Sequence, residues 1–134
     1  MYKLIKTNDY TRTRNVILRN IETGTEDVCF DDSKMFDSFH KDFSFMEQGK
    51  KYDCKILLFG SLSSGTGQKA LCRVLRNGIL CGDTKLVEVF IGNDRYYILQ
   101  DEIKDQLKNG EFDYYYTRKD LIQVNNIIHG AYLD

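Results

Sequence analysis

The stretch YDCKILLF, residues 52–59, decides the fold class. Its side chains alternate between two faces, and a period of two is typical of a β-strand. One face is apolar throughout and consists of Tyr52, Cys54, Ile56 and Leu58. The other face changes from polar to apolar, ending in Leu57 and Phe59. We therefore expect a central strand that is covered on both sides at its far end.

Segments on both sides of this strand read as further strands joined by short turns. Residues 15–21 and 27–30 flank Glu22-Thr23-Gly24, which predicts a hairpin whose turn uses the backbone freedom of Gly24. Downstream, residues 70–75 and 79–81 flank Asn77-Gly78, a sequence typical of a two-residue hairpin turn. Residues 86–91 and 95–99 predict another hairpin, and residues 111–117 a tyrosine-rich strand.

Helical signals are short. Residues 101–108 are the best helix candidate, because Ile103 and Leu107 are four positions apart and Gly110 follows. Asp31 and Asp32 are capping residues that predict a helical turn near residue 33. After it we expect apolar side chains to plug the core: Phe36, Phe39, Phe43, Phe45 and Met46. Residues 121–128 fit a strand or a helix, and residues 121–133 could pack on this chain or on a neighbour.

Seven or eight short strands with one or two short helices predict a mainly β protein. The expected architecture is a small β-barrel, OB-like in type, or a sandwich of short antiparallel strands. The chain has 134 residues, contains no proline and has no linker-like segment. We expect residues 1–134 to form a single β-rich domain.

Charge and composition restrict the partners. The 19 basic and 20 acidic residues give a net charge of −1, so a nucleic-acid partner would need a local basic patch. No apolar leader opens the sequence, and no apolar run approaches the roughly 18 residues of a membrane span. We expect a cytoplasmic protein without a membrane partner. We expect none of the four cysteines to form a disulfide; Cys54 and Cys72 read as small buried apolar residues, whereas the sequence leaves the role of Cys29 and Cys81 open.

Motifs for catalysis are weak. Gly60 and Gly65 have the spacing of a phosphate-binding loop, but Thr66 and Gly67 follow where that loop needs Lys and then Ser or Thr. The two histidines lie outside any recognisable nucleophile motif, and the cysteines lack metal-ligand spacing. We expect no catalytic residue, metal or cofactor, and an enzyme that uses the loop at residues 60–68 is the least favoured reading.

Aromatic and basic residues that lie close together in the C-terminal third are the candidate binding residues. They are Arg95, Tyr96, Tyr114, Tyr116, Arg118 and Lys119. Rings beside cations can stack bases and contact phosphates, and tyrosine also anchors protein interfaces. Tyr114 and Tyr116 share a strand face with Phe112, so that face could equally be core.

The leading hypothesis is a non-enzymatic binding module that acts through a protein partner. An inhibitor, an immunity or antitoxin-like protein and an accessory subunit all fit a compact chain without catalytic motifs. The alternative is an OB-like protein that binds single-stranded nucleic acid through the six candidate residues. That alternative predicts binding that weakens steeply with salt.

Overall fold

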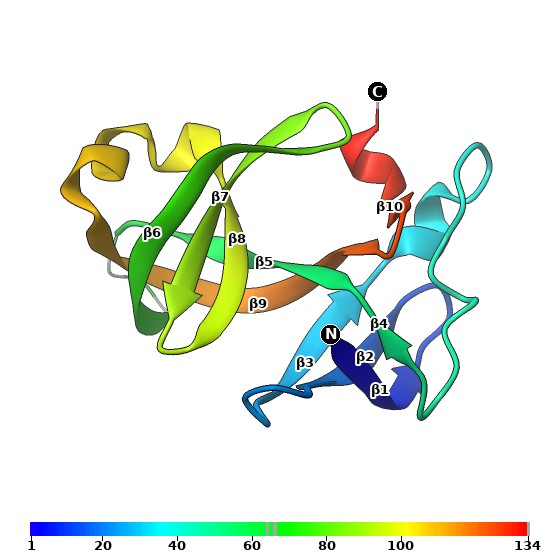
Figure 1. Ribbon diagram of the computed structural model, residues 1–134. Helices are drawn as coiled ribbons and strands as arrows, with labels where there is room; N and C mark the ends of the chain where they lie inside the picture. Colours follow the sequence, from blue (N-terminus) through cyan, green and yellow to red (C-terminus); the bar gives the residue numbers. More distant parts are fainter. Residues whose placement is uncertain (64, 66, 134) are drawn as a thin grey trace.

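Strands make up most of the computed structural model, which describes residues 1–63, 65 and 67–133 (Figure 1). Within that part of the chain ten strands belong to one continuous sheet. The strands are β1 (Tyr2–Asp9), β2 (Arg14–Asn20), β3 (Glu26–Asp31), β4 (Lys51–Tyr52), β5 (Cys54–Ser61), β6 (Gln68–Cys81), β7 (Thr84–Ile91), β8 (Asp94–Leu99), β9 (Glu111–Val124) and β10 (Ile127–Ile128). The helical elements are short 3-10 turns: η1 (Ser33–Phe36), η2 (Gln100–Glu102), η3 (Lys104–Asn109) and η4 (Gly130–Tyr132).

Five of these strands close into a barrel. β5 pairs with β8, β8 with β7, β7 with β6, β6 with β9, and β9 again with β5. The β5–β8 pairing is parallel, at Leu57 and Tyr97, and the other four are antiparallel. The predictions of a mainly β protein and of a small β-barrel are confirmed.

The first four strands extend the sheet beyond the barrel. β1, β2 and β3 form an antiparallel meander, and β4 pairs with the outer edge of β1. β3 joins the barrel by pairing in parallel with β9 at Phe30 and Asp120. Both parts contribute to one hydrophobic cluster, in which Leu4 and Val16 of the meander lie with Ile56 of the barrel.

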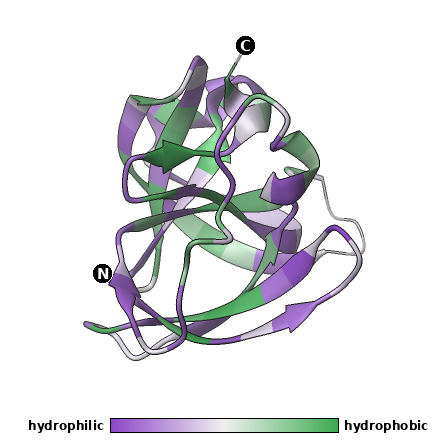
Figure 2. Ribbon diagram, turned by 90° about the vertical axis from the view of Figure 1, so that its right-hand side faces the viewer, coloured by the Kyte–Doolittle hydropathy of each residue, from purple (hydrophilic) through white to green (hydrophobic). Residues whose placement is uncertain are grey.

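The barrel is covered on both surfaces along part of β5, β7 and β8. Val87, Val89 and Ile98 point into the interior, whereas a second buried cluster lies on the outer surface. That outer cluster consists of Leu57, Cys81, Leu86, Tyr97 and Ile122, with Ile128 and Tyr132 of the C-terminal segment packed against it. Figure 2 shows both hydrophobic and hydrophilic stretches within the strands. The sequence predicts that the second face of residues 52–59 is buried at Leu57 and Phe59. Leu57 is buried as expected, whereas Phe59 is half exposed.

The predicted turn at Asn77-Gly78 is wrong. β6 continues through these residues to Cys81, and the chain reverses at Gly82-Asp83. The register passes from Arg76–Glu88 to Ile79–Leu86, so β6 has one residue more than β7 there, which is a β-bulge. Gly78 has a φ of 66°, a conformation that serves a bulge as well as a turn.

The expected aromatic plug is only partly formed. Phe43 and Met46 are buried, but Phe39 is 91% exposed and Phe36 and Phe45 are also exposed. These three rings lie on η1 and on the loops that follow it, where Phe36 contacts the ring of His129 and Phe45 contacts that of Tyr52 edge-on.

The structure also settles the form of the segment expected to be helical, residues 101–108, and of the segment left open between strand and helix, residues 121–133. Two 3-10 helices, separated at the buried Ile103, replace the single helix expected at residues 101–108. Residues 121–124 complete β9, and the chain turns at Asn125 into β10. The C-terminal segment packs on its own chain, where the backbone N–H of His129 donates to the carbonyl of Ile122.

Candidate functional site

Two of the six predicted binding residues are buried tyrosines. Tyr96 is 3% exposed and its hydroxyl donates to Asp27 at 2.7 Å. Tyr114 is fully buried and its hydroxyl donates to Glu102 at 2.9 Å. Burial raises the pKa of both phenols. Their rings pack in the core and present no face on which a ligand could stack.

Lys119 and Tyr116 belong to the joint between the barrel and the meander. The Nζ atom of Lys119 lies 2.5 Å from a carboxylate oxygen of Asp27 on β3, and its side chain is 17% exposed. The same Nζ lies over the rings of Tyr96 and Tyr116, at 4.9 and 5.3 Å from their centroids. The charge of Lys119 is therefore paired with Asp27 and two rings inside the protein, and it is not available to a ligand.

The two arginines of the predicted set are exposed but lie in different places. Arg118 on β9 sits between the rings of Phe30 and Phe59. Arg95 on β8 lines a cleft on the outer surface of the barrel. The structure thus brings Tyr96, Tyr116 and Lys119 together, buries Tyr114 separately, and places Arg95 at a surface site of its own.

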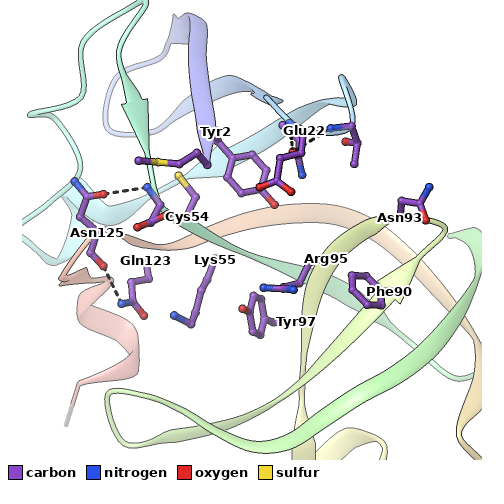
Figure 3. Close-up of a pocket in the computed structure, with 14 residues that line it drawn as sticks. Tyr2, Glu22, Cys54, Lys55, Phe90, Asn93, Arg95, Tyr97, Gln123 and Asn125 are labelled. Carbon is purple, nitrogen blue, oxygen red and sulfur yellow. Dashed lines mark hydrogen bonds between the residues drawn. The ribbon is translucent and has the colours of Figure 1, made fainter.

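That cleft has a volume of about 500 Å³ and lies between the barrel and the meander (Figure 3). One wall is the outer surface of β5, β8 and β7 with the turn between β7 and β8, and the other comes from the start of β1, the β2–β3 turn and the end of β9. It is lined by Met1, Tyr2, Asn20, Glu22, Thr23, Asp53, Cys54, Lys55, Phe90, Asn93, Arg95, Tyr97, Gln123 and Asn125.

Cations and aromatic rings are paired along the barrel wall of the cleft. Lys55, Tyr97, Arg95 and Phe90 follow one another in Figure 3. The Nζ of Lys55 lies 5.7 Å from the centroid of the Tyr97 ring, and the guanidinium of Arg95 lies 5.6 Å from that of Phe90. Arg73 of β6 approaches the Phe90 ring as well, at 5.4 Å. These distances are within the range of cation–π attraction.

A buried carboxylate fixes this wall from beneath. Glu88 of β7 is 1% exposed, and it accepts hydrogen bonds from the Tyr97 hydroxyl at 2.7 Å and from Arg76 at 3.0 and 3.3 Å. The Nε of Arg95 lies 3.7 Å from the same carboxylate. Burial alone would raise the pKa of Glu88, but these donors and the arginine charges outweigh it and lower the pKa. Glu88 therefore stays ionised and orients a ring and two cations.

Amide side chains dominate the far end of the cleft. Asn125 accepts a hydrogen bond from the backbone N–H of Asp53 at 3.0 Å, and Gln123 donates to the carbonyl of Asn125 at 2.9 Å. Asn20 also lines the cleft, and Asn93 lies at its opposite end, beyond Phe90 (Figure 3). Amides donate and accept, so the end at Asn125 can hydrogen-bond a polar planar group such as the edge of a base.

Sequence reasoning found Arg95 in this cleft and missed Lys55, Phe90 and Tyr97. A signal for them was present, because Tyr97 shares a strand face with Arg95, and Lys55 is the cation on the partly polar face of the strand at residues 52–59. What the sequence did not indicate is the parallel β5–β8 pairing that makes Leu57 and Tyr97 neighbours.

The glycine-rich loop has a structural explanation. A Cβ on Gly60 would lie 1.9 Å from the carbonyl oxygen of Tyr115, so Gly60 permits close contact between β5 and β9. Ser64 and Thr66 of the predicted loop lie outside the described residues. Over the described parts of the chain, no group of three or more His, Cys, Asp or Glu is arranged to hold a metal ion. None of the helices described has the length and apolar character needed to cross a membrane.

Comparison of the chain with protein-family models, with curated proteins and with solved structures found no match. The function is therefore inferred from the geometry of the barrel and its cleft.

Proposed function

We propose that this protein is a binding module that recognises single-stranded nucleic acid on the outer surface of β7, β8 and β5. The observation that carries this proposal is the cleft wall, where the pairs Lys55–Tyr97 and Arg95–Phe90 are held beside the buried Glu88. Tyr97 is 6% exposed and serves to hold Lys55, so Phe90, which is partly exposed, is the ring of this wall that can receive a base. A ring for base stacking beside cations for the phosphate backbone is the combination that single-strand binding requires.

The strand pairing supports an OB-like barrel whose chain begins at a different strand. In an OB barrel, a three-strand meander is followed by a helical segment, a fourth strand that pairs with the first, and a fifth strand that pairs antiparallel with the fourth and parallel with the third. Here β6, β7 and β8 are the meander, η2 and η3 follow, and β9 pairs with β6. β5 pairs antiparallel with β9 and parallel with β8, but it precedes the meander. The order is that of an OB barrel after circular permutation.

The position of the cleft supports the same proposal. OB barrels bind oligonucleotides on the face of their second and third strands and at the loops between strands one and two and between strands four and five. Here the face corresponds to β7 and β8, and the second loop corresponds to the end of β9 beside the start of β5; the first loop, the β6–β7 turn, is not among the residues that line the cleft. Phe90, Arg95 and Tyr97 line the cleft from the face, and Asp53 and Asn125 from the region of the second loop.

The overall charge of −1 means that a nucleic-acid partner needs a local basic patch, and the barrel wall of the cleft supplies basic residues close together. Lys55 and Arg95 line the cleft, and Arg73 and Arg76 of β6 contact Phe90 and Glu88 beside it. The two other carboxylates that line the cleft, Glu22 and Asp53, lie outside β5, β7 and β8. The barrel wall itself therefore carries four cations around one buried carboxylate, and such a local patch attracts a polyanion even when the whole chain is nearly neutral.

The test is fluorescence anisotropy with a labelled single-stranded oligonucleotide of roughly 12 nucleotides, a length within the site sizes of OB folds. We expect saturable binding that weakens with salt and exceeds binding to duplex of the same sequence. Lys55→Gln should weaken binding and lower the salt slope by about 0.7, the value for one lost phosphate contact on a single strand. Lys50→Gln, an exposed lysine outside the cleft, is the matched control. Absence of binding at low salt, or an equal effect of both substitutions, would refute the proposal.

A protein partner is the second candidate, and exposed apolar residues around η1 favour it. Met35, Phe36 and Phe45 are 38–52% exposed and Phe39 is 91% exposed. Beside them is an open cavity of about 520 Å³ lined in part by Phe45 and Ile127. Apolar groups of this kind anchor protein interfaces. A tagged chain that retains a discrete protein after nuclease treatment, and loses it on Phe39→Ser, would establish this function instead.

A further inference from the structure

A second site of stacked groups lies where β3, β9 and β5 meet. The guanidinium of Arg118 lies between two rings, with its central carbon 4.6 Å from the centroid of Phe30 and 4.5 Å from that of Phe59. Each residue comes from a different strand, so the sheet pairing itself builds the stack.

The guanidinium in this stack is held in a fixed orientation. Its Nε and Nη2 atoms donate to the two carboxylate oxygens of Asp120 at 2.5 and 3.0 Å. A bidentate pair of this kind fixes the plane of the group, and hydrogen bonding to Asp120 raises the pKa of Arg118. Phe59, which rests on this cation, is 50% exposed. A large ring that is fixed on one side and open to water on the other is suited to receive another planar group.

The stack lies on the same surface as the cleft. Lys55, Leu57 and Phe59 share one face of β5, and Lys55 and Phe59 are four positions apart, or roughly 13 Å at about 3.3 Å per residue. Leu57 between them is buried in the outer cluster, against which Ile128 and Tyr132 pack. A linear ligand could therefore reach both sites by passing over the C-terminal segment, whereas a short one could occupy only the cleft.

We propose that Phe59, supported by Arg118 and Phe30, is a second base-stacking position for the single strand that enters the cleft. This inference rests on the proposed function and adds the path of the ligand: from the cleft, over the C-terminal segment that covers Leu57, to the β3–β9–β5 junction. A base stacks on the exposed face of Phe59, while Arg118, whose charge is paired with Asp120, holds the ring in place from its other face.

The test compares oligonucleotides of roughly 4 and roughly 12 nucleotides, the lower and a middle value among the site sizes of OB folds. We expect Phe59→Ala to weaken binding of the longer strand by about fivefold to a hundredfold, the range that corresponds to one lost stacking contact, and to leave the shorter strand unchanged. Leu71→Ala, which removes another exposed apolar side chain from a barrel strand, should change neither affinity. Urea unfolding of each variant checks that the fold is intact.

Phe59→Trp supplies a direct signal, because the natural chain contains no tryptophan. Its fluorescence should be quenched when the longer strand binds and stay unchanged with the shorter strand, and its affinity should remain near that of the natural protein. Equal effects of Phe59→Ala on both lengths, no effect on either, or an unquenched tryptophan at saturation would overturn the inference while the proposed function stands. Failure of the natural protein to bind either length would overturn both.

Discussion

Glu88→Gln is the substitution that best tests how the cleft wall is held. The carboxylate is 1% exposed and accepts from Tyr97 and Arg76, with Arg95 nearby. Glutamine keeps the shape of the side chain but removes its charge. Its NH2 group is itself a donor, so it cannot accept the hydrogen bonds from Arg76 and Tyr97 that one carboxylate oxygen accepts. A hydrogen bond to a charged group contributes about 1.5–3 kcal/mol. Arg76 is largely exposed and can be solvated when it loses this partner. We therefore expect the free energy of unfolding to fall by about 2 kcal/mol, near the lower end of that range, or Tm by roughly 8 °C for a chain of this size.

Urea unfolding of the natural protein and the variant across pH is the assay. The folded pKa of Glu88 is lowered, so its contribution is complete above the pKa of the unfolded chain and is lost as the pH falls through the folded pKa. The difference between the two proteins should therefore be constant near neutral pH and shrink in acid. Glu111→Gln, at an exposed glutamate, is the control and should change stability by less than about 0.5 kcal/mol. A Glu88→Gln protein as stable as this control, or a difference that persists in acid, would refute the reasoning.

Three further predictions concern other parts of the fold. Gly60→Ala should cost about 3 kcal/mol or more in urea unfolding, because its Cβ would meet the Tyr115 carbonyl; a neutral result would contradict the close contact. The hydrogen bond from His129 is the main cause that lowers the pKa of Asp32. Asp32→Asn should therefore lose about 1 kcal/mol near neutral pH, and the loss should vanish as the pH falls through that lowered pKa; a pH-independent difference would argue against it. Burial raises the pKa of Cys81 to about 11, so thiol labelling followed by mass spectrometry should modify it at least tenfold more slowly in the folded than in the unfolded chain.

Local patterns predicted the fold class, because each depends on residues close in sequence. The alternating residues 52–59 form the end of β4 and most of β5, and the turn at Gly24 joins β2 and β3 into a hairpin. Asn77-Gly78 misled because a glycine with positive φ serves a bulge or a turn equally, and the choice depends on which residues of β7 pair with β6. That register is set by the closed barrel and not by the dipeptide.

The candidate site was less predictable, since exposure depends on contacts between distant residues. Tyr96 and Tyr114 are core residues because their hydroxyls reach Asp27 and Glu102, and neither carboxylate was indicated as a partner by spacing. Arg95 and Arg118 are exposed, and rings beside them come from other strands. Phe90 lies across the β7–β8 pair, and Phe59 lies across the β5–β9 pair. Cross-strand neighbours of this kind follow only from the register.

The chain order of the barrel has a consequence for the cleft. Because β5 precedes β6 to β9 in the chain, β5 follows the meander and β9 continues into the C-terminal segment, and both of these flanking segments line the cleft. The meander precedes β5 and brings Asn20 to the cleft, fixed to the barrel where Thr23 donates to Asp94 at 2.6 Å. The segment after β9 brings Asn125. On the proposed function, the barrel wall supplies affinity through its cations and rings, whereas these flanking segments supply the hydrogen-bonding groups that discriminate between bases. Asn20→Ala and Asn125→Ala should accordingly change base preference more than overall affinity.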